Sequence, residues 1–154
     1  SESIARNIAV GDGEIEQERL LKASEIACIK EYIMSLPLKF NTKIGRDGIG
    51  LSQGQKQRIL IARAVYKNPN YIFLDEATNS LDARNEKAIV ENLDKFYSGR
   101  TVVIVAHRLS TVRNADRIIA IEDGKVAESG SHNELITKRG VYYNLIKNQL
   151  ELGN

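Results

Sequence analysis

Two groups of polar residues have the types and the spacing that suit phosphate chemistry. Ser52 and Gly54 stand at the start of a segment with a helical pattern, and helix N-termini attract phosphate through their free backbone N–H groups. Further along, the apolar run Tyr71–Leu74 predicts a strand that ends in Asp75 and Glu76. In open α/β sheets, ligands bind beyond the carboxyl ends of the strands. The two groups therefore indicate a site for a phosphorylated ligand, where the carboxylates could hold a metal ion or accept a proton.

A histidine, His107, follows the β-branched run Thr101–Val105, which predicts a second strand. If the two strands are parallel neighbours, Asp75, Glu76 and His107 come to the same edge of the sheet. Each feature has a simpler interpretation when it stands alone. An Asp-Glu pair is usually two solvated loop charges, and a histidine at this place can simply cap a strand end. The order of the motifs along the chain favours the functional interpretation.

The hydrophobic pattern predicts an α/β chain. Helices are expected over Glu14–Leu36, Ser52–Lys67, Asn85–Phe96 and Tyr142–Leu150, and buried strands over Tyr71–Leu74 and Thr101–Val105. Asp123-Gly124 predicts a hairpin turn, and Ser131–Glu134 has the Ser-x-x-Glu form of a capping box. The order strand, helix, strand predicts a parallel sheet with a crossover helix. The segment before residue 51 has no strand pattern, so we expect it to form a separate helical lobe.

Composition narrows the functional classes. The 154 residues suit one ordinary domain, and a formal net charge of +2 is too small to argue for binding to nucleic acid or to an anionic membrane surface. Apolar runs are short and interrupted by charges, so no segment of this sequence could span a bilayer. The single cysteine, Cys28, fits a small core residue in a helical segment. It offers no disulfide, which is consistent with a reducing cytosol.

Four motifs in order carry a resemblance to a known family. Leu51–Arg58 and Tyr71–Glu76 closely resemble the signature sequence and the Walker B motif of the nucleotide-binding domain of ATP-binding-cassette (ABC) transporters. Ala77–Asp82 resembles the D-loop, and Val105–Val112 resembles the switch-histidine segment. The flanking segments resemble exporter-type members, so the resemblance covers nearly the whole chain. Residues 149–154 resemble the end of the peptidase-containing peptide or bacteriocin exporters.

The resemblance implies an α/β fold with the parallel sheet core of P-loop NTPases, truncated, together with a helical signature subdomain. Residues 1–68 would form the helical subdomain, and residues 69–154 the C-terminal part of the α/β core. The phosphate-binding run Gly-x-x-x-x-Gly-Lys-Ser/Thr does not occur in this sequence, because Gly124-Lys125 lacks the upstream glycine and is followed by valine. We therefore expect the chain to be the C-terminal portion of a longer polypeptide, without ATPase activity of its own.

The resemblance also implies roles for particular residues. Asp75 would hold Mg²⁺, Glu76 would be the general base, and His107 would contact the γ-phosphate of ATP. In this family ATP lies between two nucleotide-binding domains, so the signature of one domain faces the nucleotide of the other. Contacts to the partner domain or its ATP are implied for Ser52, Gln53, Gly54, Gln55 and Asp82. Gln53 and Asn79 replace the family's commoner glycine and serine, and neither change removes a reacting group.

The function favoured by these motifs is therefore part of the ATP-hydrolysing domain of an exporter, on the cytoplasmic face of the membrane. Its partners would be ATP, Mg²⁺, a second nucleotide-binding domain and the coupling helices of a transmembrane domain. A loop in Leu36–Gly50 would meet those helices, with Arg46 in place of the commoner glutamate. Two alternatives stay open: an ABC ATPase that acts on DNA ends or ribosomes, and a truncated module without ATPase activity. Loss of the P-loop strand would expose apolar surface, so we expect self-association.

Overall fold

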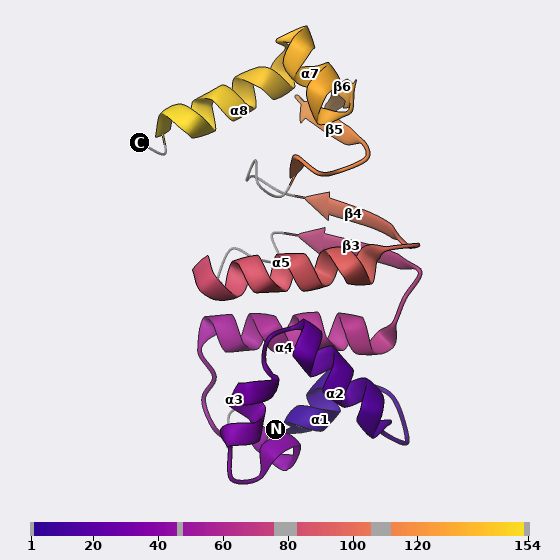
Figure 1. The fold of residues 1–154 in the computed structure, drawn as a ribbon, viewed down its shortest axis with the longest axis vertical. Coiled ribbons are helices and arrows are strands. Elements are labelled where there is room, and N and C mark those ends of the chain that lie inside the picture. Colours follow the sequence, from indigo (N-terminus) through magenta and orange to yellow (C-terminus); the bar gives the residue numbers. More distant parts are fainter. Residues whose placement is uncertain (1, 46–47, 76–82, 106–111, 153–154) are drawn as a thin grey trace. The chain divides into compact units, whose positions relative to one another are not determined.

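The computed structural model describes residues 2–45, 48–75, 83–105 and 112–152, with side chains for all of these except 83–87 and 149–152. Two compact units make up the chain, residues 1–103 and residues 104–154, and each is described by itself. Figure 1 shows the order of the elements along the chain. Among the described residues, no helix combines the length and the apolar character needed to cross a bilayer.

Helices form most of the described part of residues 2–67. They are α1 Ile4–Ile8, α2 Gln17–Ile26, α3 Lys30–Ser35 and α4 Gln53–Lys67, with a 3-10 turn at Lys39–Asn41. Both α1 and α2 pack against α4. The apolar faces of these helices meet in one core, whose fully buried members include Ile4, Ile8, Leu20, Ile29, Ile33 and Tyr66. Isolated helices of this length are marginal in water, so this shared burial is what stabilises them.

The single helix expected over Glu14–Leu36 is wrong, because the chain forms α2 and α3 with a break between them. The backbone of Cys28 is left-handed, with a φ of 51°. Leu20 and Ile29 lie on opposite faces of any continuous helix, at 100° per residue, yet both are buried in the same core. The break brings them together. Cys28 itself is only half-buried, the side-chain amide of Asn92 lies 3.5 Å from its sulfur, and burial raises the pKa of its thiol.

A small sheet also lies within the first 50 residues, so the expectation of a strand-free lobe is wrong. Strand β1, Glu2–Ser3, pairs antiparallel with β2, Lys43–Ile44. The turn after β2 folds back closely, since the Ile49 N–H donates to the Lys43 carbonyl at 3.0 Å. A Cβ at Gly48 would come within 2.3 Å of the same carbonyl oxygen. Only glycine fits this approach of backbone to backbone.

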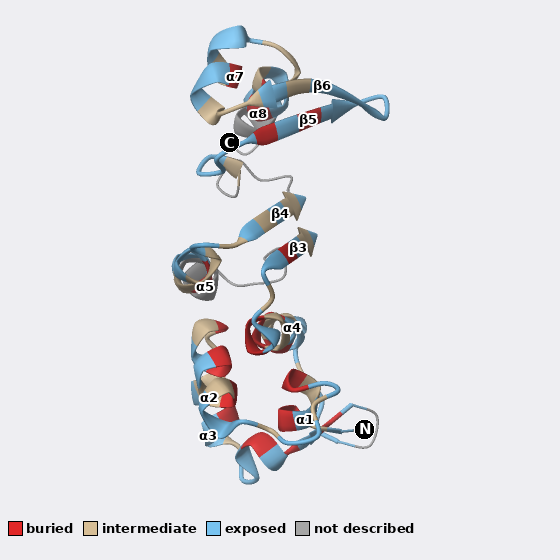
Figure 2. Ribbon diagram, turned by 90° about the vertical axis from the view of Figure 1, so that its right-hand side faces the viewer, coloured by how far each residue is buried: buried red, intermediate tan, exposed pale blue. Residues whose placement is uncertain are grey.

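The strand–helix–strand unit predicted from the sequence is present. It consists of β3 Tyr71–Asp75, α5 Ala83–Tyr97 and β4 Thr101–Val105, with β3 and β4 as neighbours in one sheet. The two arrows point the same way in both Figure 1 and Figure 2, which makes the pair parallel with α5 as its crossover. On its far side α5 contacts α2, so the helical layer and the sheet belong to one compact unit.

The expectation that β3 and β4 are buried strands is only partly correct. Ile72 is buried, but its neighbours Tyr71 and Phe73 keep 70% and 78% of their surface exposed. In β4, Val103 and Val105 are also exposed. Successive side chains of a strand point to opposite faces, so one face of this sheet is covered within the described residues and the other presents apolar side chains to solvent.

Phe73→Ser is expected to reduce self-association of the 154-residue chain with little loss of stability, because the phenyl ring is exposed and its removal shrinks an apolar patch. Light scattering over a concentration series measures the change. The matched control is Ile72→Ser, which buries a hydroxyl on the opposite face and should lower the melting temperature by several degrees. Unchanged association in Phe73→Ser would contradict the expectation.

Residues 104–154 form the second unit around an antiparallel hairpin. Its elements are β5 Ile118–Glu122, β6 Lys125–Gly130, α7 His132–Lys138 and α8 Val141–Leu152. The predicted turn is confirmed: Asp123 and Gly124 both have positive φ, 50° and 72°, as a type I′ turn requires. The small core of this unit contains Ile118, Ala120, Leu135, Tyr142 and Ile146.

Polar contacts fix the ends of the two helices in this unit. The predicted capping box of α7 is confirmed, with the Ser131 N–H donating to the Glu134 carboxylate at 2.8 Å, and this hydrogen bond lowers the pKa of Glu134. The Glu128 carboxylate accepts from the Tyr142 N–H at 2.9 Å and so caps the start of α8. His132 is half-buried, with Nδ1 2.8 Å from the Tyr142 hydroxyl.

Candidate nucleotide-binding site

The N-terminal end of α4 has the geometry that its Ser-x-x-Gln pattern dictates. Ser52 is the N-cap, with an extended backbone, and its Oγ accepts from the Gln55 N–H at 3.2 Å. The Gln55 side chain accepts in turn from the Ser52 N–H at 2.9 Å. The Ser52 hydroxyl can still donate its own proton to an anionic oxygen. Because the first N–H groups of a helix have no intrahelical acceptor, Gln53 and Gly54 are the backbone donors at this end.

The rest of α4 explains why this end can be held in place. The buried face runs along the helix through Ile59, Ile61, Ala62, Val65 and Tyr66. At its far end Asn68 adopts the left-handed conformation, with φ and ψ both 50°, and stops the helix. Ser52 and Gln53 are exposed, whereas Gly54 and Gln55 are half-buried. The polar first turn is thus presented to solvent by a helix anchored in the core.

Asp75 is the last residue of β3, and its side chain is exposed. Because β3 and β4 are parallel neighbours (Figure 1), the ends of both strands lie at one edge of the sheet. His107 follows β4 by two positions. The predicted residues Glu76, Asp82 and His107 lie outside the described residues, so their proximity to Asp75 stays a prediction.

The N-terminal end of α4 and the carboxyl end of β3 lie on the same side of their unit (Figure 1). The reason is that the chain reverses between residues 67 and 71, where α4 ends and β3 begins. The first end offers N–H and hydroxyl donors, which suit phosphate oxygens. The second offers a carboxylate, which suits Mg²⁺. Within the described residues, no cluster of three or more His, Cys, Asp and Glu side chains could hold a metal ion. At this edge, Asp75 could contribute one carboxylate ligand.

The sequence did not indicate a polar network at the opposite end of α4. It joins Tyr66 and Lys67 to the connection between α1 and α2. Lys67 and its partner Asp12 stand 55 residues apart in the chain. No local pattern marks such a pair, so only the packing of the helices could reveal it.

Comparison with known proteins decides the family. The sequence profile described as "ABC transporter" matches residues 2–79, which is half of the chain. The chain belongs to the ABC transporter family. The resemblance seen in its motifs is thereby confirmed, and so is the α/β, P-loop NTPase-like fold class, because a solved ABC exporter has the same fold over nearly the whole chain.

The relatives of this ABC transporter chain come from distant organisms. The chain is 46% identical over 147 residues to human "ATP-binding cassette sub-family B member 5", covering 96% of this chain and 12% of that protein. It is 46% identical over 149 residues to the "ATP-dependent lipid A-core flippase" of Saccharophagus degradans, covering 97% of this chain and 25% of the flippase. The chain therefore spans a quarter or less of the length of these two relatives.

A solved structure gives the same result at the level of the fold. The "Structure of a bacterial Atm1-family ABC exporter with ATP bound" matches with a TM-score of 0.88 and 38% sequence identity. The match covers 96% of this chain and 26% of the exporter chain. Both units of the ABC transporter chain are thus included in the matched region.

Proposed function

We propose that this chain is the C-terminal part of the ATP-hydrolysing domain of an ABC exporter, and that the intact protein couples ATP hydrolysis to transmembrane export. The observation that carries the proposal is the likeness to an exporter solved with ATP bound, at 38% identity over 96% of the chain. The likeness to a flippase and to a solved ABC exporter favours transport over an ATPase that acts on DNA ends or ribosomes.

The proposed roles follow from the chemistry of phosphoryl transfer, in which positioning and charge neutralisation dominate. Bound Mg²⁺ would neutralise charge on the phosphates. Asp75, exposed at the end of β3, would hold that ion. Glu76 would accept the proton of the attacking water, and His107 would contact the γ-phosphate of ATP.

The other half of the proposal concerns a partner domain. The exposed N-terminal end of α4 would face ATP held by a second nucleotide-binding domain. Contacts to that ATP or to its domain are proposed for Ser52, Gln53, Gly54, Gln55 and Asp82. We further propose the division into a helical subdomain, residues 1–68, and a part of the α/β core, residues 69–154. Coupling helices of a transmembrane domain would contact the helical subdomain from the cytoplasmic face of the membrane.

Phosphate release by the intact protein tests the proposed function. The full-length protein, purified in detergent and reconstituted in liposomes, should hydrolyse Mg-ATP, and omission of Mg²⁺ should abolish the activity. The 154-residue chain alone should release no phosphate, because it carries no P-loop lysine. An intact protein that releases no phosphate at saturating Mg-ATP would overturn the proposal.

Ser52→Ala should both destabilise α4 by about 1 kcal/mol, through loss of the N-cap, and weaken ATP hydrolysis by the intact protein. The matched control is Ser131→Ala, since Ser131 caps α7 in the same capping-box geometry. Thermal denaturation should show similar losses in both variants, whereas only Ser52→Ala should lower the ATPase rate. Equal ATPase rates in Ser52→Ala and Ser131→Ala would show that Ser52 does not contact ATP.

A further inference from the structure

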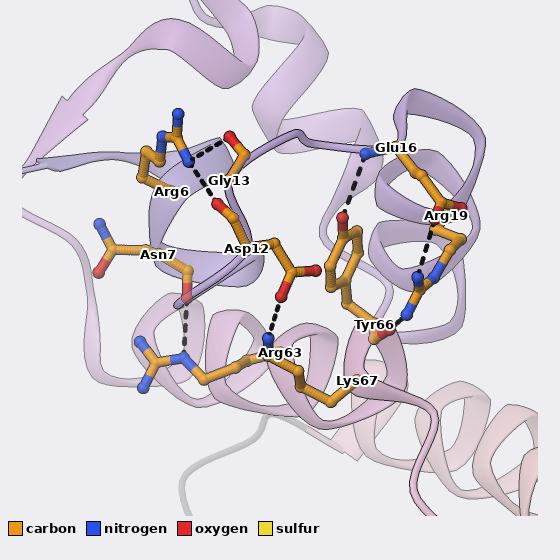
Figure 3. Close-up of polar contacts among 9 residues, drawn as sticks. All are labelled: Arg6, Asn7, Asp12, Gly13, Glu16, Arg19, Arg63, Tyr66 and Lys67. Carbon is orange, nitrogen blue, oxygen red and sulfur yellow. Dashed lines mark hydrogen bonds and ion pairs between the residues drawn. The ribbon is translucent and has the colours of Figure 1, made fainter.

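The last turn of α4 is joined to the connection between α1 and α2 by two long-range contacts, drawn in Figure 3. Lys67 Nζ donates to Oδ1 of Asp12 at 2.5 Å. The hydroxyl of Tyr66 accepts from the backbone N–H of Glu16 at 3.2 Å. We call these four residues, Asp12, Glu16, Tyr66 and Lys67, the polar latch. They come from elements that are about 50 residues apart in the sequence.

Arginines on both sides hold the latch in its shape (Figure 3). Arg6 on α1 donates through Nη1 to the backbone carbonyls of Asp12 and Gly13, at 2.7 and 3.3 Å. Arg19 on α2 donates through Nη2 to the Tyr66 carbonyl at 2.6 Å, and its guanidinium lies 4.7 Å from the centre of the tyrosine ring. Both sides of the latch therefore have a second, independent set of contacts.

The contacts of the polar latch contribute to the position of α4 rather than to the stability of the fold. The side chain of Lys67 keeps 40% of its surface exposed, and that of Asp12 keeps 30%. Ion pairs this exposed contribute little to stability. The burial of apolar side chains already holds α4 in the core, but hydrophobic contact is non-directional. Hydrogen bonds are directional. The buried face of α4 sets which side of the helix meets the core, and the polar latch adds directional contacts that can fix the exact rotation of α4 about its own axis.

A rotation fixed at one end of α4 is also fixed at the other. The helix has 15 residues, which at about 1.5 Å per residue makes a rod of roughly 22 Å. Its N-terminal end carries Ser52 and Gly54, and any rotation of this rod about its axis turns the donors by the same angle. The latch thus lies far from these donors and yet controls the direction in which they point.

We propose that Asp12, Tyr66 and Lys67 are positioning residues for the phosphate donors at the N-terminal end of α4. The inference rests on the proposed function, because it assumes that those donors contact ATP. It adds residues that touch neither nucleotide nor metal and that act only through the helix. Loosening the latch should weaken the grip on ATP without removing any group that contacts it, so the Michaelis constant for ATP should rise while the maximal rate changes little.

The test uses ATP hydrolysis by the intact exporter as a function of ATP concentration. Lys67→Met should raise KM for ATP about threefold, and the double variant Lys67→Met with Tyr66→Phe about tenfold, with kcat within about twofold of wild type. The melting temperatures of both variants should stay close to wild type. The charge exchange Asp12→Lys with Lys67→Asp should return KM most of the way to the wild-type value.

The matched control is Lys30→Met, which removes the ion pair between Lys30 on α3 and Glu25 on α2, and its lysine is about as exposed as Lys67. Its KM should equal that of wild type. An unchanged KM in the latch variants, or a KM that rises as much in Lys30→Met, would overturn the positioning role. A lowered melting temperature with unchanged KM would also overturn it, since that result describes a purely structural contact. Absence of hydrolysis in the wild-type protein would overturn the proposed function itself.

Discussion

Glu76→Gln is expected to slow ATP hydrolysis by the intact protein by about 10²- to 10⁴-fold, the usual contribution of a general base. Glu76 directly follows β3, next to the exposed Asp75. Glutamine keeps the size and the polarity of the side chain but cannot accept the proton of the attacking water. Binding of ATP should therefore persist while turnover is lost. Phosphate release and equilibrium nucleotide binding, measured on the same preparation, separate the two effects.

The matched control for this variant is Glu122→Gln. Glu122 is an exposed carboxylate at the end of β5, in the hairpin of residues 104–154. Its ATPase rate should stay within about twofold of wild type, as surface changes away from a site usually have small effects. Undiminished hydrolysis in Glu76→Gln would show that Glu76 is not the general base.

The sequence predicted those features of the fold that depend on short-range patterns. The Ser-x-x-Glu pattern predicted the capping box at Ser131, because the interacting groups are only three residues apart. Asp123-Gly124 gave the hairpin turn for the same reason. The parallel crossover followed from the order of β3, α5 and β4 together with the strong preference for one handedness of connection.

Long-range packing decided what the sequence could not predict. The helix breaks at Cys28, where the backbone is left-handed. Leu20 and Ile29 would lie on opposite faces of a continuous helix, and the break lets both pack into one core. The exposure of Phe73 depends on what covers the second face of the sheet, which the strand's own residues do not specify. The latch between Asp12 and Lys67 likewise has no local signature.

The residues of the candidate site also differ in whether short-range patterns predict their geometry. The local backbone conformation at Ser52 is set by contacts within one helical turn, and it agrees with the helix start expected there. Glu76, Asp82 and His107 follow strands, in segments outside the described residues, so motif resemblance carries their assignment. The experiment on Glu76 therefore tests the part of the site for which the family's motifs are the main argument.

Leu135→Ala is expected to destabilise residues 104–154 by about 2 to 5 kcal/mol, the usual cost of truncating a fully buried leucine. The side chain of Leu135 is completely buried in a core that includes Ile118, Tyr142 and Ile146. With so few apolar partners, the cavity has little surrounding structure that could collapse into it. Total stabilities of domains are only about 5 to 15 kcal/mol, so the loss is large enough to open this unit.

Hydrogen exchange of the backbone amides in β5 and β6 measures this effect, because their protection reports the opening of the hairpin. In Leu135→Ala the protection of these strands should fall by about 30-fold or more, since 1.4 kcal/mol corresponds to a factor of ten. The matched control is Leu145→Ala on α8, whose side chain is 53% exposed and should change stability by less than about 0.5 kcal/mol. Equal loss of protection in both variants would show that the core assigned to this unit does not hold the hairpin.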